Sequence, residues 1–163
     1  MTVHVVPAAE PPAGEQVGEW PLRADTSSAR LARRLVTQAM DGAHEQALRR
    51  AALVTSELVA NSVRHARGGV SVALERVARG WLVVVSDDSS APPVVQQGGP
   101  LSETGRGMLI VARISERLGW ARTPTGKVVW AQLGEEPSSG PADEGLRDDE
   151  GGTAPTPRAD PAT

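Results

Sequence analysis

Three polar residues on one predicted helix are the first candidates for chemistry. Glu57, Asn61 and His65 follow one another at intervals of four residues, so they span only about 80° of the helix surface. Val54 and Leu58 lie within or next to that arc, which places the three side chains at the border of the buried face. Polar groups at such a border need hydrogen-bond partners or a ligand. The spacing leaves two interpretations open, a hydrogen-bonded structural row and a binding site.

A second candidate is a carboxylate at the end of a predicted central strand. Val83, Val85 and Asp87 share one strand face, so Asp87 follows two valines that we expect to be buried. Ligand sites in α/β folds often lie where the chain leaves the sheet. The alternative is a turn-forming aspartate, because Asp-Asp-Ser-Ser over 87–90 is favourable turn chemistry.

A third candidate is the sequence Thr104-Gly105-Arg106-Gly107, which opens a predicted helix. Glycines before a helix let backbone amides approach an anion, and the helix N-terminus favours negative charge. The pattern is not a dinucleotide fingerprint, because Ile110 occupies the third glycine position. Nor is there a Walker motif around Lys127, since Val128 stands where Ser or Thr is required. A flexible helix start is the structural alternative.

Hydrophobic periodicity and turn residues place these candidates on a defined order of elements. The spacing predicts strands over 17–22, 70–75, 81–85, 119–122 and 127–133, helices over 28–40, 44–66 and 107–118, and an irregular stretch over 88–104. The order is strand-helix-helix-strand-strand-loop-helix-strand-strand. It indicates an α/β (α+β) two-layer sandwich, with a mixed, mostly antiparallel sheet and helices on one face. A long loop inside a small domain is typical of a functional segment.

Composition bounds the domain and excludes several classes of protein. The 163 residues contain no Cys, Tyr or Phe, which excludes disulfides, thiol nucleophiles and Cys-based metal sites and disfavours aromatic stacking of nucleic acid. Net charge is −3; residues 134–163 hold eight acidic and two basic side chains, a net of −6, so residues 1–133 carry +3. We therefore expect a loose N-terminal tail over 1–15, one domain over 16–133 and a disordered acidic, Pro/Gly-rich tail over 134–163. With no signal peptide or membrane-spanning run, a cytoplasmic location is expected, without binding to nucleic acid or membranes.

The three candidate motifs, taken in their order along the chain, resemble the conserved motifs of a known family. Glu57-Leu-Val-Ala-Asn61-Ser-Val-Arg-His65-Ala66 resembles the N-box of the GHKL ATPase superfamily, and Asn-x-x-x-His-Ala is similar to its bacterial anti-sigma-factor serine kinase branch. Val85-Ser-Asp87 resembles the start of the first glycine box, although Ser89 and Ala91 replace its glycines, and Gly105-Arg-Gly107-Met-Leu-Ile-Val resembles the second. The stretch 126–133 is similar to the final strand of short actinobacterial ATP-binding regulators. The resemblance covers about residues 17–133.

The resemblance implies a Bergerat ATP-binding fold and a role for each matched residue. Asn61 would hold Mg²⁺, and Glu57 would act as the general base. Asp87 would accept a hydrogen bond from the adenine amino group, and the loop 88–104 would form the ATP lid. The resemblance implies phosphate contacts from the remaining matched residues, namely Arg64, His65, Gly105, Arg106 and Gly107.

The resemblance also implies a function. The chain would be an ATP- and Mg²⁺-dependent serine/threonine protein kinase and anti-sigma factor that binds a sigma factor and phosphorylates an anti-anti-sigma (STAS-type) partner. A homodimer is a further expectation from the family. Two alternatives remain at this point: a nucleotide-dependent protein-binding regulator without kinase turnover, and a fragment of a histidine kinase.

Overall fold

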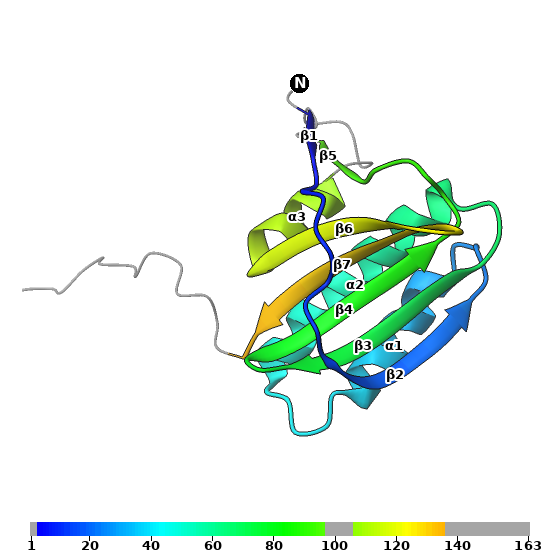
Figure 1. The fold of residues 1–163 in the computed structure, drawn as a ribbon. Coiled ribbons are helices and arrows are strands. Elements are labelled where there is room, and N and C mark those ends of the chain that lie inside the picture. The colour runs from blue at the N-terminus through cyan, green and yellow to red at the C-terminus, as the bar shows by residue number, and fades with distance from the viewer. Residues whose placement is uncertain (1–2, 97–105, 136–163) are drawn as a thin grey trace, which may run out of the picture.

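A computed structural model describes residues 3–96 and 106–135 of the chain. Its main sheet is antiparallel throughout, in the order β2-β3-β4-β7-β6, and the helices cover one face of it (Figure 1). The two-layer sandwich predicted from the sequence is therefore confirmed. The main elements are β2 (Glu15–Leu22), α1 (Ser28–Ala39), α2 (Glu45–His65), β3 (Val70–Val77), β4 (Gly80–Asp87), α3 (Arg106–Ile114), β6 (Arg117–Thr123) and β7 (Gly126–Gly134).

The helices form where polar start signals precede apolar residues at helical spacing. Before α1, the Asp25 carboxylate accepts hydrogen bonds from the backbone N–H and the hydroxyl of Ser27, at 2.8 Å and 2.5 Å. These bonds lower the pKa of Asp25. Ala32 and Val36 are fully buried on the inner side of α1. The same apolar repeat continues on α2, so both helices pack on the sheet and build one core.

The central strand β4 is buried along nearly its whole length because both of its faces are covered. Val83 and Val85 face the helices and belong to the main core. Leu82 and Val84 face the other way and form a smaller apolar cluster with Trp130 of β7. A strand packed on both sides holds the residue at its end in a fixed place, and that residue is Asp87.

The outer face of the sheet is crossed by the N-terminal segment, which the sequence analysis expects to be loose. Residues 6–14 follow β1 (Val3–Val5), which pairs with β5 (Val94–Gln96) in a separate two-stranded sheet. The Ala9 N–H donates to the Trp120 carbonyl at 2.8 Å, and the Trp130 indole N–H donates to the Ala9 carbonyl at 2.8 Å. Figure 1 shows the segment running over the strands. The difference has a physical cause, because burial of Val6 and pairing with edge strand β6 stabilise a stretch whose composition carries no strand signal.

Two predicted boundaries also shift. The third helix ends at Ile114, four residues before the predicted end, and β6 starts at Arg117. The cause is the Glu116 N–H, which donates to the Gln132 carbonyl at 2.9 Å and so begins the pairing with β7. Within the predicted loop 88–104, residues 94–96 form β5 and residues 97–104 lie outside the described residues. Nearly all of the predicted acidic tail, 136–163, lies outside them as well. None of the helices in the described part combines the length and hydropathy of a membrane-spanning segment.

Candidate functional site

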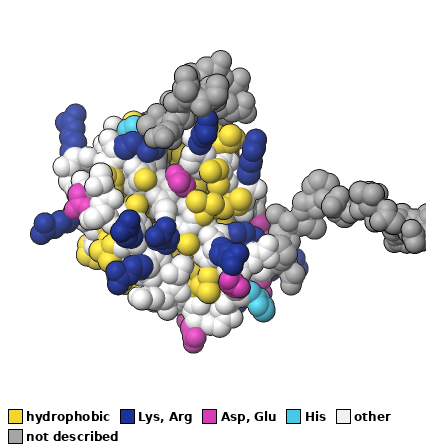
Figure 2. Space-filling model, turned by 180° about the vertical axis from the view of Figure 1, so that it is seen from behind, with side chains coloured by type: hydrophobic (Ala, Val, Ile, Leu, Met, Phe, Trp, Pro, Cys, Tyr) yellow, Lys and Arg dark blue, Asp and Glu magenta, His cyan; other side chains and the backbone are white. Residues whose placement is uncertain are grey.

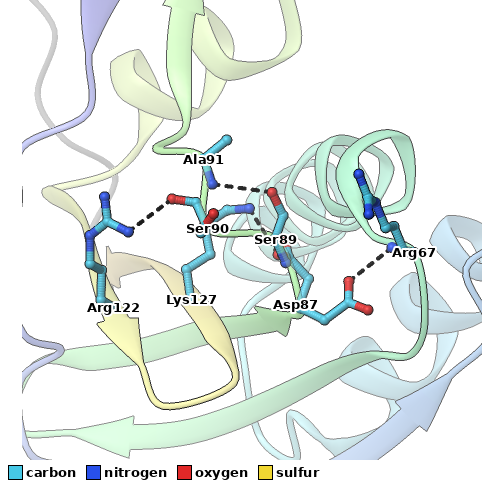
Figure 3. A network of polar contacts seen from close by, with 8 residues as sticks. Arg67, Asp87, Ser89, Ser90, Ala91, Arg122 and Lys127 are labelled. Atoms are coloured by element: carbon cyan, nitrogen blue, oxygen red, sulfur yellow. Dashed lines mark hydrogen bonds and ion pairs between the residues drawn. The ribbon is translucent and has the colours of Figure 1, made fainter.

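The end of β4 carries a buried ion pair. Asp87 and Lys127 are opposite one another in the register of β4 and β7, and the Lys127 Nζ lies 2.8 Å from the Asp87 Oδ1. Their side chains are 0% and 1% exposed. The Ser89 backbone N–H also donates to Oδ1, at 2.9 Å. Figure 3 shows these groups gathered at the strand end. The Asp87 carboxylate is therefore held from one side, through a single oxygen.

The second oxygen of that carboxylate is left without a partner. Asp87 Oδ2 is buried and has no hydrogen bond among the described residues. A buried carboxylate oxygen without a donor is costly, and such exceptions in native structures often mark functional sites. Oδ2 thus offers a strong acceptor to a ligand group that donates a hydrogen bond. A turn-forming aspartate uses the contact with Ser89, but that role leaves Oδ2 unexplained.

Lys127 is the residue of this site that sequence reasoning misses. In the sequence, Lys127 is a candidate only through a phosphate-binding Walker motif, and Val128, which stands where that motif requires Ser or Thr, excludes the motif. Two signals were present: it is the single Lys of the chain, and it begins the apolar run that forms the last strand. The sequence does not show the register of β4 and β7, which sets Lys127 beside Asp87. Gly126 fits the same arrangement, because a methyl group there would collide with the Asp87 carbonyl.

The loops beside the strand end are tied together by hydrogen bonds. The Arg67 backbone N–H donates to Asp88 Oδ1 at 2.9 Å, which joins the end of α2 to the end of β4 (Figure 3). The Ala91 N–H donates to the Ser89 hydroxyl at 3.3 Å. Both Ser89 and Ala91 stand where the glycine box has glycines. In this chain, the first turn after β4 is therefore stabilised by side-chain contacts.

The polar row on α2 is not a hydrogen-bonded structural row. Asn61 is 6% exposed, Glu57 is half-buried, and His65 is exposed together with Arg64 in the last turn of the helix. No hydrogen bond or ion pair joins the side chains of Glu57, Asn61 or His65 to another group within residues 3–96 and 106–135. The Asn61 amide is therefore available to a ligand. This favours the binding-site interpretation left open by the spacing.

The start of α3 meets the middle of α2. A methyl group on Gly107 would collide with the Glu57 carboxylate, so a larger residue there requires Glu57 to turn away. Arg106 is exposed at the first position of the helix. Gly105 lies outside the described residues, so its predicted contact with an anion stays a prediction. The structure brings Glu57 and Gly107 together and leaves the phosphate-binding roles of Arg64, His65, Gly105, Arg106 and Gly107 as predictions.

The donor set suits a hard cation as well as an organic ligand. The amide oxygen of Asn61 is a ligand type that Mg²⁺ accepts, and Mg²⁺ bound to a nucleotide takes most of its remaining ligands from phosphate and water. Within the described ranges, no group of three or more His, Cys, Asp or Glu side chains is arranged to hold a metal ion. A carboxylate, Glu57, lies one helical turn from that amide.

Comparison with known proteins identifies the domain. A family model described as the histidine kinase-like ATPase domain matches residues 22–133, a range that holds every site residue discussed above. No curated protein matches the chain. The match ends where the predicted resemblance ends and starts five residues after its beginning. It covers the three described helices and strands β3, β4, β6 and β7 almost completely, but only the last residue of β2.

Proposed function

The chain belongs to the histidine kinase-like ATPase family, within the GHKL superfamily, and from that premise we propose that it binds ATP with Mg²⁺ and acts as a cytoplasmic serine/threonine protein kinase of the anti-sigma-factor type. Its protein substrate is an anti-anti-sigma partner of the STAS type, and its second partner is a sigma factor. Domains of the family bind ATP. The kinase activity and both partners are the parts proposed here.

The unpartnered Asp87 Oδ2 is the observation that carries the proposal. It is a buried, acceptor-only oxygen at a strand end, and adenine presents an amino group that donates hydrogen bonds. A buried acceptor discriminates strongly in favour of a ligand with the matching donor, because any other ligand leaves it unpaired. Guanine carries a carbonyl at the equivalent ring position, which would face the carboxylate with a second acceptor.

Lys127 is a positioning residue in this proposal. Its ammonium group pairs with Oδ1 at 2.8 Å, so it fixes the Asp87 carboxylate through that oxygen and leaves Oδ2 for the ligand. An ionised carboxylate can only accept hydrogen bonds, whereas a protonated one can also donate. The pair therefore favours adenine over guanine by holding a buried acceptor, Oδ2, where adenine presents its amino group.

Phosphoryl transfer depends on the row along α2. Glu57 accepts the proton of the substrate serine hydroxyl, while that oxygen forms a bond to the γ-phosphorus and the bond from phosphorus to the bridging oxygen breaks, releasing ADP. Asn61 would hold Mg²⁺, which supplies positive charge to the phosphates when bound. The remaining matched residues contact phosphate oxygens: Arg64, His65, Gly105, Arg106 and Gly107.

A second candidate function is a nucleotide-dependent regulator that binds its partners without transferring phosphate. The replacement of two box glycines by Ser89 and Ala91 favours it, because the hydrogen-bonded turn at 87–91 restricts the start of the proposed lid. The two candidates share the ATP site and differ only in phosphoryl transfer.

The experiment separates binding from transfer. Thermal unfolding of the full chain is followed with and without MgATP, and transfer to a purified STAS-type protein is followed by mass spectrometry. At a ligand concentration about 100-fold above the Kd, binding adds roughly 2.7 kcal/mol of stability. We expect Glu57→Gln to keep the ATP-induced shift and abolish transfer, and Asn61→Ala to weaken the shift.

The matched control lies on the same helix. Glu45→Gln removes an exposed carboxylate of α2 that pairs with Arg49, and it should leave both ATP binding and transfer unchanged. An ATP-induced shift with no transfer to any STAS-type protein would support the second candidate. No shift at millimolar MgATP would exclude both.

A further inference from the structure

The outer side of α1 is a cationic face. Arg30, Arg33 and Arg34 are all exposed and lie within about 100° of the helix surface. The helix contains no acidic residue, and Leu31, beside the arginines, is 46% exposed. Seen from the helix side, Figure 2 shows Lys and Arg side chains gathered over this layer. We call these four residues the arginine face.

The charges of the arginine face are not balanced within the described residues. No ion pair or hydrogen bond within residues 3–96 and 106–135 involves the guanidinium groups of Arg30, Arg33 and Arg34. The neighbouring helix α2 follows the usual arrangement of a solvated surface, with Glu45 four residues before Arg49 and paired with it. The two helices therefore present different surfaces, and only that of α1 has a single sign.

This arrangement works against the helix itself. Arg30 and Arg34 are like charges at an i, i+4 spacing, which destabilises a helix. Arg30 also lies in the first turn, where the helix dipole disfavours a cation. No side-chain cap offsets these effects, because the Ser27 hydroxyl donates to Asp25. An anionic ligand on this face would remove the repulsion.

The chain itself contains a segment of complementary chemistry. Residues 136–163 hold seven acidic and two basic side chains. The acidic residues include the pair Asp143-Glu144 and the run Asp148-Asp149-Glu150, and between these two groups lies Leu146, the one large aliphatic residue of the segment. Arg147 follows Leu146 directly, so the order is acidic–Leu–Arg–acidic, and residues 143–150, with five acidic side chains and one basic, carry a net charge of −4.

The segment also starts close to the end of α1. Glu135, the residue that precedes it, pairs with Arg76 and lines a hollow of about 150 Å³ together with Gly42, Ala43 and His44 of the α1–α2 connection. The chain therefore leaves the domain next to the C-terminal end of α1. A helix of twelve residues is about 18 Å long, and a fully extended chain covers roughly 3.3–3.6 Å per residue, so both acidic groups can reach the arginines.

We propose that the acidic C-terminal segment, residues 136–163, binds the arginine face of α1 in the same molecule. Carboxylates pair with the guanidinium groups, in geometry that Arg favours through bidentate contacts, and Leu146 covers Leu31. Because segment and face belong to one chain, their effective concentration is roughly millimolar, which supports a contact made of individually weak pairs. The bound segment shields α1 from other acidic ligands. This inference does not depend on nucleotide binding.

Paramagnetic broadening in the full chain tests the contact. The chain has no Cys, so Thr153→Cys accepts a single nitroxide label just after the second acidic group. At ~0.01 M salt we expect the backbone amide signals of residues 29–35 to weaken about twofold or more, and to recover near 1 M salt, where the screening length falls from ~30 Å to ~3 Å. Unweakened α1 signals at low salt would overturn the proposal, and so would broadening that high salt leaves unchanged.

Two matched pairs of substitutions locate the surface. Arg30→Gln with Arg34→Gln should remove the broadening, whereas Arg79→Gln with Arg113→Gln makes the same charge change on exposed residues elsewhere and should preserve it. Equal loss with both pairs would show a general charge effect and overturn the assignment to α1. The last test mixes chains that carry the nitroxide with chains that carry no nitroxide but are isotope-enriched for detection. Broadening of the α1 amide signals in that mixture would show contact between two copies instead of within one, and would overturn the proposal.

Discussion

The β4–β7 ladder has a buried charge pair at one end, and beside its other end lies an exposed pair of the same kind, between Arg76 of β3 and Glu135 just after β7. At one end, Asp87 and Lys127 pair with side chains that are 0% and 1% exposed. Beside the other end, Arg76 and Glu135 pair with side chains that are 43% and 50% exposed, and Arg76 also lies over the ring of Trp81. A buried pair gains little net stability over apolar residues because both charges lose their water, and a surface pair is worth little because water screens it. The buried pair is therefore better explained by function than by stability, and its end of the sheet is where we place the nucleotide.

The largest expected effect is the loss of one partner from the buried pair. Lys127→Met leaves the Asp87 carboxylate buried without a counter-charge, and we expect a loss of about 3–5 kcal/mol in the free energy of unfolding. Chemical denaturation measures it. Lys127→Met combined with Asp87→Leu removes both charges and should recover most of that stability. If Lys127→Met alone costs less than about 1 kcal/mol, the two ends of the ladder do not differ as described.

A smaller effect is expected at the contact of α3 with α2. The methyl group of Gly107→Ala would collide with the Glu57 carboxylate, and because that group is the far end of a flexible side chain, Glu57 turns away at a cost of about 1 kcal/mol. Phosphoryl transfer should fall more than ATP binding, because Glu57 is the proposed base. Gly69→Ala is the control, since a methyl group there meets nothing within 4 Å. Equal stability and activity for the two variants would contradict the close packing at Gly107.

At the exposed charge pair, Arg76–Glu135, we expect a smaller loss in the free energy of unfolding than for Lys127→Met or Gly107→Ala. Arg76→Gln removes a surface ion pair and a cation–π contact, and together these contribute no more than about 1 kcal/mol to the free energy of unfolding. The loss should shrink further at high salt, and ATP binding should stay unchanged. A loss as large as that for Lys127→Met would remove the contrast on which the comparison rests.

The smallest effect concerns a carboxyl on β3. Burial, and secondly repulsion from Glu19, raise the pKa of Glu75 above its ordinary value of 4.5. Since an acid with a raised pKa in the folded state opposes folding once it is ionised, the penalty is present at neutral pH and disappears as the pH falls through the folded-state pKa. Glu75→Gln should therefore raise stability at pH 7, by less than about 0.5 kcal/mol. The gain over the parent should vanish in acid; a gain that grows in acid would reverse the assigned sign.

The sequence predicts most of the helices and strands, because local patterns determine them. It predicts little of the strand register and the long-range contacts, because these depend on pairing between distant segments. Helix spacing places Glu57 and Asn61 on one border of α2, and alternating apolar residues identify β3 and β4, because both signals repeat within a few residues. The pair of Asp87 with Lys127 depends on a register across forty residues of chain, and no local pattern reports it. The crossing of the sheet by residues 6–14 was missed for the same reason, since its hydrogen bonds go to Trp120 and Trp130.

The site at Asp87 and the arginine face of α1 also differ in the surroundings of their charges. The site at Asp87 holds its ion pair away from water and leaves one oxygen for a ligand, whereas the arginine face of α1 carries cations that no group of residues 3–96 and 106–135 balances. Substitutions in the first region should change nucleotide affinity, and Arg30→Gln with Arg34→Gln should leave it unchanged. A common loss of ATP binding from both regions would show that the two are not independent.

The most direct test of the account is calorimetric titration of the full chain with MgATP and MgGTP under identical conditions. The unpartnered Asp87 Oδ2, on a carboxylate that Lys127 holds through Oδ1, should accept the adenine amino group and reject the guanine carbonyl. We therefore predict that MgATP binds and that MgGTP binds about 100-fold more weakly or worse. Equal affinity for the two nucleotides, or no heat with either, would contradict the assignment of Asp87 as the base-recognition residue.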